Sequence, residues 1–157
     1  MKVGRGFDQA GCLGIPWLLL CLSLGANILD DALNDFLGYY NATVLSLYGH
    51  FSWFPRIDLT LRNWLVGVIV ADAVLLLLTP FAYRNSSVLR PIAYIFSTIM
   101  LLIGSGSILA SVLGQTVPSV HFAGGAPGIY TSPLLLAASV FLFWRLRSSA
   151  NQFPNDW

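Results

Sequence analysis

Four apolar stretches, separated by polar or aromatic connections, dominate the pattern of residues along the chain. They cover residues 14–29, 64–83, 92–113 and 129–145. A helix of about 20 residues crosses the roughly 30 Å of hydrocarbon in a bilayer, so each stretch has about the length of a transmembrane helix, the first being slightly short. The pattern predicts one all-α membrane domain over residues 1–157, in which a four-transmembrane-helix bundle encloses an interior cavity.

The connections between these stretches differ in character. Residues 30–63 are rich in aromatic side chains and poor in charge. A structureless loop of that length is uncommon in a compact domain. We therefore expect short interfacial helices or an aromatic lid over one mouth of the bundle. The connection at residues 114–128 has no Lys, Arg, Asp or Glu and is rich in Gly and Pro, which predicts an irregular loop.

The composition supports a membrane location. Hydrophobic residues make up 56% of the chain and charged residues 10%, and the mean hydropathy is +0.71. These values are too apolar for an ordinary soluble domain. The formal net charge of +1 and the lack of a basic patch exclude a nucleic-acid partner. An apolar run that continues through Ile28 and Leu29 favours a retained first helix over a cleaved signal peptide.

The two cysteines, Cys12 and Cys21, predict neither a disulfide nor a metal site. On one helix they would lie about 13 Å apart along the axis, which is too far for a disulfide. With only two histidines in the chain, no spacing matches a structural zinc site. We predict no bound metal and no cofactor.

The distribution of basic residues predicts the orientation in the membrane. Most Lys and Arg residues lie on the side of the two termini, and positive residues concentrate on the cytoplasmic side of membrane proteins. Both termini are therefore predicted to be cytoplasmic, and a eukaryotic source would place the protein in the endoplasmic reticulum. The opposite side carries the sequon Asn41-Ala42-Thr43, which is then accessible for glycosylation. The basic residues on the side of the termini are Lys2, Arg5, Arg84, Arg90, Arg145 and Arg147, and those on the other side are Arg56 and Arg62.

Asp72 is the one acidic or basic residue of the second apolar stretch and lies near its middle. A carboxylate at that depth costs at least roughly 2.5–3.5 kcal/mol in lipid. We therefore expect Asp72 to be protonated, to face the bundle interior, or to have a polar partner or ligand. The simplest alternative is a protonated Asp72 that joins two helices by one hydrogen bond. Because a buried neutral carboxyl group can donate a proton or bind an amine, Asp72 is the first candidate catalytic residue.

Three further acids, Asp30, Asp31 and Asp58, are candidate catalytic residues at one mouth of the bundle. A solvated helix end is the alternative role for Asp30 and Asp31. A surface ion pair with Arg56 or Arg62 is the alternative for Asp58. The two histidines lie in separate connections, where such residues are usually packed or solvated. The candidate ligand contacts near these acids are Asn27, Trp64, Tyr94, Tyr130, His50 and His121.

Small residues recur one helical turn apart in the third apolar stretch. Gly106 is paired in this way with Ala110, and Ser107 with Ser111. Such pairs let helix backbones approach closely, so helix packing is the favoured interpretation. Room for a ligand is the alternative.

Several short segments of the chain form a recognisable pattern. An acid follows the first helix, Asp58 precedes Trp64 at the start of the second, and Asp72 lies two turns further on. The other segments of the pattern are Arg90-Pro91-Ile92-Ala93-Tyr94-Ile95, Tyr130-Thr131-Ser132-Pro133-Leu134-Leu135 and Arg145-Leu146-Arg147. With these segments the chain resembles the EXPERA group of membrane proteins. The group contains the emopamil-binding sterol isomerases and the sigma-2 receptor, and the chain is most similar to the sigma-2 receptor branch.

The resemblance implies four membrane helices around a ligand cavity. It also implies that Asp30 or Asp31, Asp58, Trp64 and Asp72 line that cavity. Asp72 stands where that branch has a Glu. The helices carry no His and Glu pair of the kind that the sterol isomerases use.

The expected function is the binding of a sterol, terpenoid or similar lipid in an intramembrane cavity. If a protonated Asp faces an alkene or epoxide and a second carboxylate removes a proton, the protein is an isomerase or cyclase. Without such a base it is a non-enzymatic lipid-binding or trafficking protein. Two alternatives of another class are a proton- or ion-handling subunit in which Asp72 titrates, and a scaffold subunit of a membrane complex. Self-association as a homodimer stays open.

Overall fold

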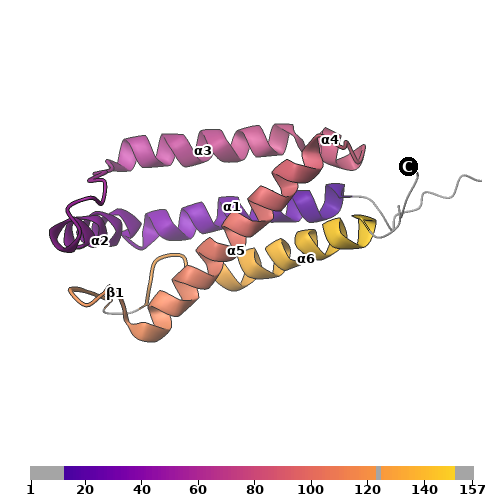
Figure 1. Cartoon of the computed structure of the whole chain (residues 1–157). Coiled ribbons are helices and arrows are strands. Elements are labelled where there is room, and N and C mark those ends of the chain that lie inside the picture. The colour runs from indigo at the N-terminus through magenta and orange to yellow at the C-terminus, as the bar shows by residue number, and fades with distance from the viewer. Residues whose placement is uncertain (1–12, 123–124, 151–157) are drawn as a thin grey trace, which may run out of the picture.

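The computed structural model describes residues 13–122 and 125–150, which form helices and one small hairpin (Figure 1). Lys2 and Arg5, which contribute to the predicted orientation, and Cys12 lie outside the described residues. The elements in chain order are α1 (Gly14–Leu33), α2 (Phe36–His50), α3 (Leu61–Leu77), α4 (Thr79–Tyr83), α5 (Leu89–Leu113), β1 (Gln115–Val117), β2 (Val120–His121) and α6 (Ser132–Ala150).

Three helical segments of the described residues are long and apolar enough to cross a membrane. They are α1, the combined segment of α3 and α4 over Leu61–Tyr83, and α5. The coarse prediction of an all-α chain with membrane-length helices is therefore confirmed. The fourth predicted stretch is also helical, as α6, but it begins at Ser132 and is not one of the three.

The two long connections differ in how well the sequence anticipated them. Residues 30–63 contain the helix α2, which agrees with the expectation that so long a connection is not structureless. The prediction of an irregular loop over residues 114–128 is wrong for its first half, because β1 and β2 pair there as an antiparallel hairpin. Gly114 makes the sharp turn from α5 into β1 in the left-handed conformation, with φ of +68°, which glycine adopts without a steric penalty.

The packed core lies among α1, α5 and α6, with α4 at one end. Trp17 of α1 is fully buried, and its ring meets the edge of Phe96 of α5 with 5.3 Å between ring centroids. Leu135 and Leu142 of α6 are also fully buried against these helices. A side chain at Gly104 would press against Leu136 of α6, so this glycine allows α5 and α6 to approach closely.

Helix α3 lies outside this core and packs along one side of α1 (Figure 1). None of its residues is buried. Its end near Leu78 is determined by Pro80, which has no backbone N–H to donate to the carbonyl of Leu76. The indole N–H of Trp17 donates to the neighbouring carbonyl of Leu75 at 3.0 Å, which ties the end of α3 to the core.

Helix α2 is held in place by side-chain hydrogen bonds. Two pairs of hydroxyl groups, Thr43 with Thr116 and Ser46 with Ser119, join it to the β1–β2 segment at 2.6 Å each. The Asn41 side chain binds the backbone of Leu59 twice. Its Nδ2 donates to the Leu59 carbonyl at 3.0 Å, and its Oδ1 accepts from the Leu59 N–H at 3.1 Å.

Candidate functional site

Asp72 lies on the side of α3 that faces α1 and is half-buried. The residue opposite is Gly25, where a Cβ atom would lie 3.4 Å from Asp72 Oδ2. Gly25 therefore leaves room for the carboxyl group between the two helices. Cys21, one turn earlier on α1, is fully buried.

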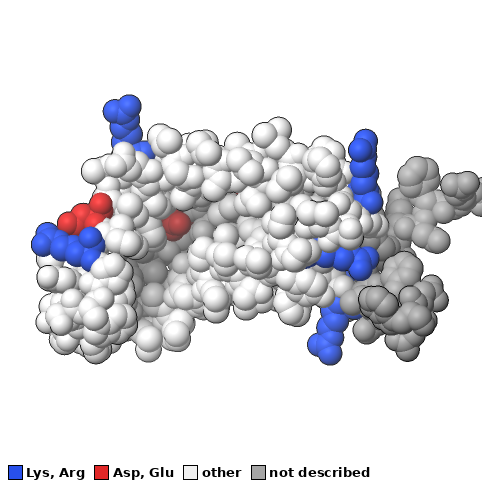
Figure 2. Space-filling model, turned by 45° about the horizontal axis from the view of Figure 1, so that its top comes forward, with Lys and Arg blue, Asp and Glu red and all other residues white. Residues whose placement is uncertain are grey.

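A pocket of about 250 Å³ surrounds this carboxyl group between α1 and α3. Figure 2 shows acidic atoms inside a hollow in an otherwise uncharged band of the surface. Asp72 Oδ1 is buried and has no hydrogen-bond partner among the described residues. The interhelical hydrogen bond that would explain Asp72 structurally is thus not formed there. We call this site the Asp72 pocket; its other lining residues are Gly25, Ile28, Leu29, Leu65, Ile69, Ala73 and Leu76.

Asp30 lies at a different junction, where α1 meets the start of α6. Its Oδ2 accepts hydrogen bonds from both the backbone N–H and the hydroxyl of Thr131, at 3.0 Å each. Its Oδ1 accepts from Asn34 at 2.6 Å, and Asn27 donates to the Thr131 hydroxyl at 3.1 Å. A carboxylate near a helix start satisfies N–H groups that lack partners within the helix. Asp30 and Asn27 therefore position α6.

Asp31 lies beside Gly128 at the same junction. A Cβ atom on Gly128 would lie 2.6 Å from Asp31 Oδ1 and 2.7 Å from Asn27 Nδ2, and the φ of Gly128 is +76°. Glycine is therefore the residue that this turn accommodates. Neither Asp31 nor Asp30 lines the Asp72 pocket.

Asp58 and Trp64 lie at the end of the molecule that holds α2. Asp58 forms an exposed ion pair with Arg56 at 3.1 Å, which matches the surface role considered for it. Trp64 is half-buried, and its ring stacks on Phe36 of α2 with 5.2 Å between centroids. The eight residues from Trp64 to Asp72 separate the two by about 12 Å along the helix. Neither Asp58 nor Trp64 lines the Asp72 pocket.

The remaining candidates are distributed over several elements. His50 is exposed at the end of α2, and His121 is exposed in β2. Tyr130 is 76% exposed, and Tyr94 packs edge-on against Phe143 with 5.6 Å between centroids. Within the described part of the chain, no group of three or more His, Cys, Asp or Glu residues could hold a metal ion.

A larger cavity lies between α2 and α5 and holds none of these candidate residues. The signal for it in the sequence was the row of small residues in α5. Gly106 and Ala110 line this cavity, and a Cβ on Gly106 would have no atom within 4 Å. Gly106 therefore makes no close helix contact among the described residues, unlike Gly104.

Comparisons of the chain with protein-family models, curated proteins and solved structures found no match.

Proposed function

We propose that the protein is an integral membrane protein that binds a sterol, terpenoid or similar lipid in the Asp72 pocket. The observation that carries this proposal is that Asp72 Oδ1, at the wall of an apolar pocket, has no hydrogen-bond partner in the described part of the chain. A ligand that places one amine or hydroxyl group beside Asp72 provides the missing hydrogen bond. Its apolar body then lies along the aliphatic side chains of α1 and α3.

The distribution of charge supports a membrane location and the proposed orientation. Basic side chains gather at the two ends of the elongated molecule, and the band between them is almost uncharged (Figure 2). Arg84 and Arg90 flank the turn between α4 and α5, whereas Arg56 and Arg62 precede or begin α3. We propose that the first group faces the cytoplasm, that α6 is the fourth span, and that a eukaryotic source would place the protein in the endoplasmic reticulum.

The lining of the Asp72 pocket favours binding over catalysis. An isomerase or cyclase needs one group to donate a proton and another to remove one. Asp72 is the only titratable residue that lines the described pocket. Asp30 is held by Thr131 and Asn34, and Asp58 by Arg56. We therefore propose a lipid-binding or trafficking role.

The test is to purify the protein in a mild detergent and identify co-purifying lipids by mass spectrometry. Asp72→Asn and Gly25→Leu are compared with wild type, because the first removes the charge and the second fills the pocket. We expect one enriched lipid with an amine or hydroxyl group, depleted in both variants.

The matched controls are Asp58→Asn, an acid at the surface, and Gly67→Leu, an exposed glycine of α3 with open space beside it. Both controls should retain the lipid. A lipid profile that is the same in wild type, Asp72→Asn and Gly25→Leu, all folded by circular dichroism, would contradict the proposal.

A further inference from the structure

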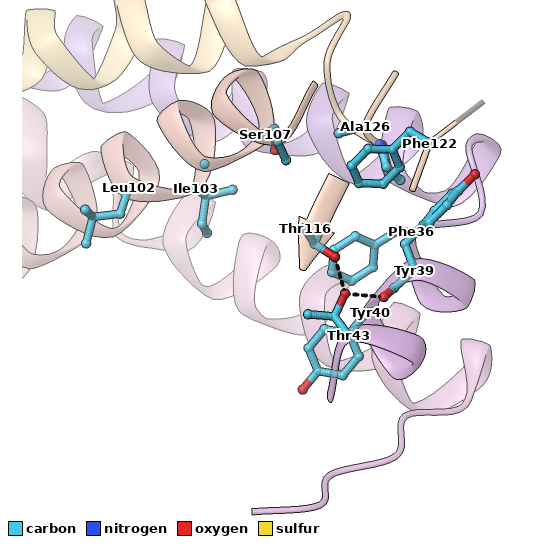
Figure 3. A pocket seen from close by; sticks show the side chains of 13 residues that line it. Phe36, Tyr39, Tyr40, Thr43, Leu102, Ile103, Ser107, Thr116, Phe122 and Ala126 are labelled. Atoms are coloured by element: carbon cyan, nitrogen blue, oxygen red, sulfur yellow. Dashed lines mark hydrogen bonds between the residues drawn. The ribbon is translucent and has the colours of Figure 1, made fainter. Parts of the chain in front are cut away.

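The cavity between α2 and α5 has a volume of about 290 Å³, close to the lower end of the roughly 300–1,000 Å³ typical of ligand sites. It lies at the end of the molecule where α2 and the β1–β2 segment meet α5 (Figure 3). It shares no lining residue with the Asp72 pocket. We call it the Ser107 cavity; it is lined by Phe36, Tyr39, Tyr40, Thr43, Leu102, Ile103, Gly106, Ser107, Ala110, Thr116, Phe122, Ala126 and Pro127.

The two long walls of the Ser107 cavity have different shapes. The α2 wall presents aromatic rings, and Phe122 adds another ring that lies 4.7 Å from that of Tyr39 between centroids (Figure 3). The α5 wall is smooth at Gly106 and Ala110, because these residues have little or no side chain to project into the cavity. A slot between aromatic rings and a smooth helix face fits a flat apolar group, which can stack on the rings.

The Ser107 hydroxyl differs from the other serine and threonine hydroxyl groups of α5. Ser97, Thr98 and Ser105 each donate to a backbone carbonyl of their own helix. Ser111 accepts a hydrogen bond from the N–H of Ala126 at 2.7 Å. Ser107 has no hydrogen bond to any described residue, and it lies on the cavity wall (Figure 3). It is therefore available to a ligand.

The lining of the Ser107 cavity also determines the charge of its ligand. Every lining residue is uncharged at neutral pH. A charged group placed there would lose its hydration without gaining a partner. The hydroxyl groups of Thr43 and Thr116, which also line the cavity, are hydrogen-bonded to each other at 2.6 Å. Thr43 in addition donates to the Tyr39 carbonyl at 2.7 Å. Among the serine and threonine residues of the lining, Ser107 is thus the one whose hydroxyl has no hydrogen bond to a described residue.

We propose that the Ser107 cavity binds a neutral, flat ring compound with one oxygen function, which forms a hydrogen bond with the Ser107 hydroxyl. The ring of the ligand lies between the aromatic residues of α2 and the smooth face of α5 at Gly106. This site is independent of the Asp72 pocket, whose ligand needs an amine or hydroxyl group beside a carboxyl group. The protein therefore has two ligand sites with different chemistry.

Benzophenone is a suitable probe because it is a neutral diaryl ketone that reacts with nearby C–H bonds when irradiated. Full-length protein in phosphatidylcholine vesicles is irradiated with increasing benzophenone, and the labelled residues are identified by peptide mass spectrometry. We expect saturable labelling of α2 and α5 residues that line the Ser107 cavity. Gly106→Leu should abolish it, because the new side chain enters open space in the cavity.

Ser107→Ala should weaken the saturable labelling roughly three- to tenfold, the loss expected for one hydrogen bond. The matched controls are Ser105→Ala, whose hydroxyl is exposed and donates to Leu101, and Gly67→Leu on α3. Both should label as wild type does. Asp72→Asn should also label normally, so a failure of the Asp72 pocket and a failure of this site are distinguishable.

Two outcomes would overturn the proposal. Labelling that does not saturate, or that is unchanged in a folded Gly106→Leu variant, would show that benzophenone reaches the protein only from the lipid. Equal labelling of the Ser107→Ala and Ser105→Ala variants would remove Ser107 as the polar contact.

Discussion

Helices α1 and α3 run side by side, yet their apolar residues contact different surroundings. Buried residues make up 44% of the apolar window of α1 and only 6% of that of the α3–α4 segment. The more exposed segment is also the more apolar of the two. In water such a helix face would be strongly disfavoured, but lipid tails are as apolar as leucine. The strong apolarity of the exposed segment is therefore compatible with contact with lipid.

The largest effect that separates the core from α3 is expected for Leu142→Ala. Leu142 is fully buried, with 0% of its surface accessible. Its truncation should lower the free energy of unfolding by roughly 2–4 kcal/mol. Val70→Ala on α3, where the side chain is 55% exposed, should cost less than roughly 0.5 kcal/mol. Unfolding by SDS in mixed micelles, followed by circular dichroism, measures both. Equal losses would mean that α3 is packed as tightly as α6.

A glycine pair gives the second contrast. Gly128→Ala should destabilise the protein by roughly 2 kcal/mol, because a Cβ atom there meets Asp31 and Asn27 and the left-handed conformation is unfavourable for alanine. Gly67→Ala in α3 meets open space and should stabilise the helix by up to roughly 0.5–1 kcal/mol. The same SDS titration compares the two. A destabilised Gly67→Ala variant would indicate a close neighbour of α3.

Trp17→Phe tests the link between α3 and the core. Phenylalanine keeps a ring against Phe96 but cannot donate to the Leu75 carbonyl, so we expect a loss of about 1 kcal/mol. Amide hydrogen exchange should accelerate in residues 61–77 more than in α6. Trp53→Phe, at a side chain that is 79% exposed, is the control and should change neither quantity. Uniform acceleration across all helices would show that Trp17 serves only the core.

The smallest effect is expected for Asp58→Asn. The ion pair with Arg56 is exposed, and such pairs contribute less than roughly 1 kcal/mol. Asp30→Asn should cost more, because its carboxylate accepts two hydrogen bonds from Thr131 inside the structure. Thermal unfolding in detergent at low and high salt compares the two variants. A larger loss of stability for Asp58→Asn than for Asp30→Asn would contradict the placement of Asp30 inside the structure and of Asp58 at the surface.

The sequence predicted the features that depend on local signals. The three membrane-length helices followed from apolar length, and the helix in residues 30–63 followed from the length of that connection. The partners of the acids were not predictable in this way. Asp30 meets Thr131 across 101 residues, and nothing near either residue specifies the other. The Ser107 cavity had only an ambiguous signal, because small residues serve both packing and ligand space.

If Asn41 faces the compartment in which sugars are transferred to asparagine, its double hydrogen bond with Leu59 would exclude glycosylation once it has formed. In the folded protein the Asn41 side-chain nitrogen is engaged with a backbone carbonyl, and the sequon lies within the helix α2. A glycan on this nitrogen is bulky and would compete with that contact. A glycan would therefore have to be attached to Asn41 before these hydrogen bonds form. The glycosylated fraction at Asn41 would then indicate how soon after synthesis this part of the chain folds.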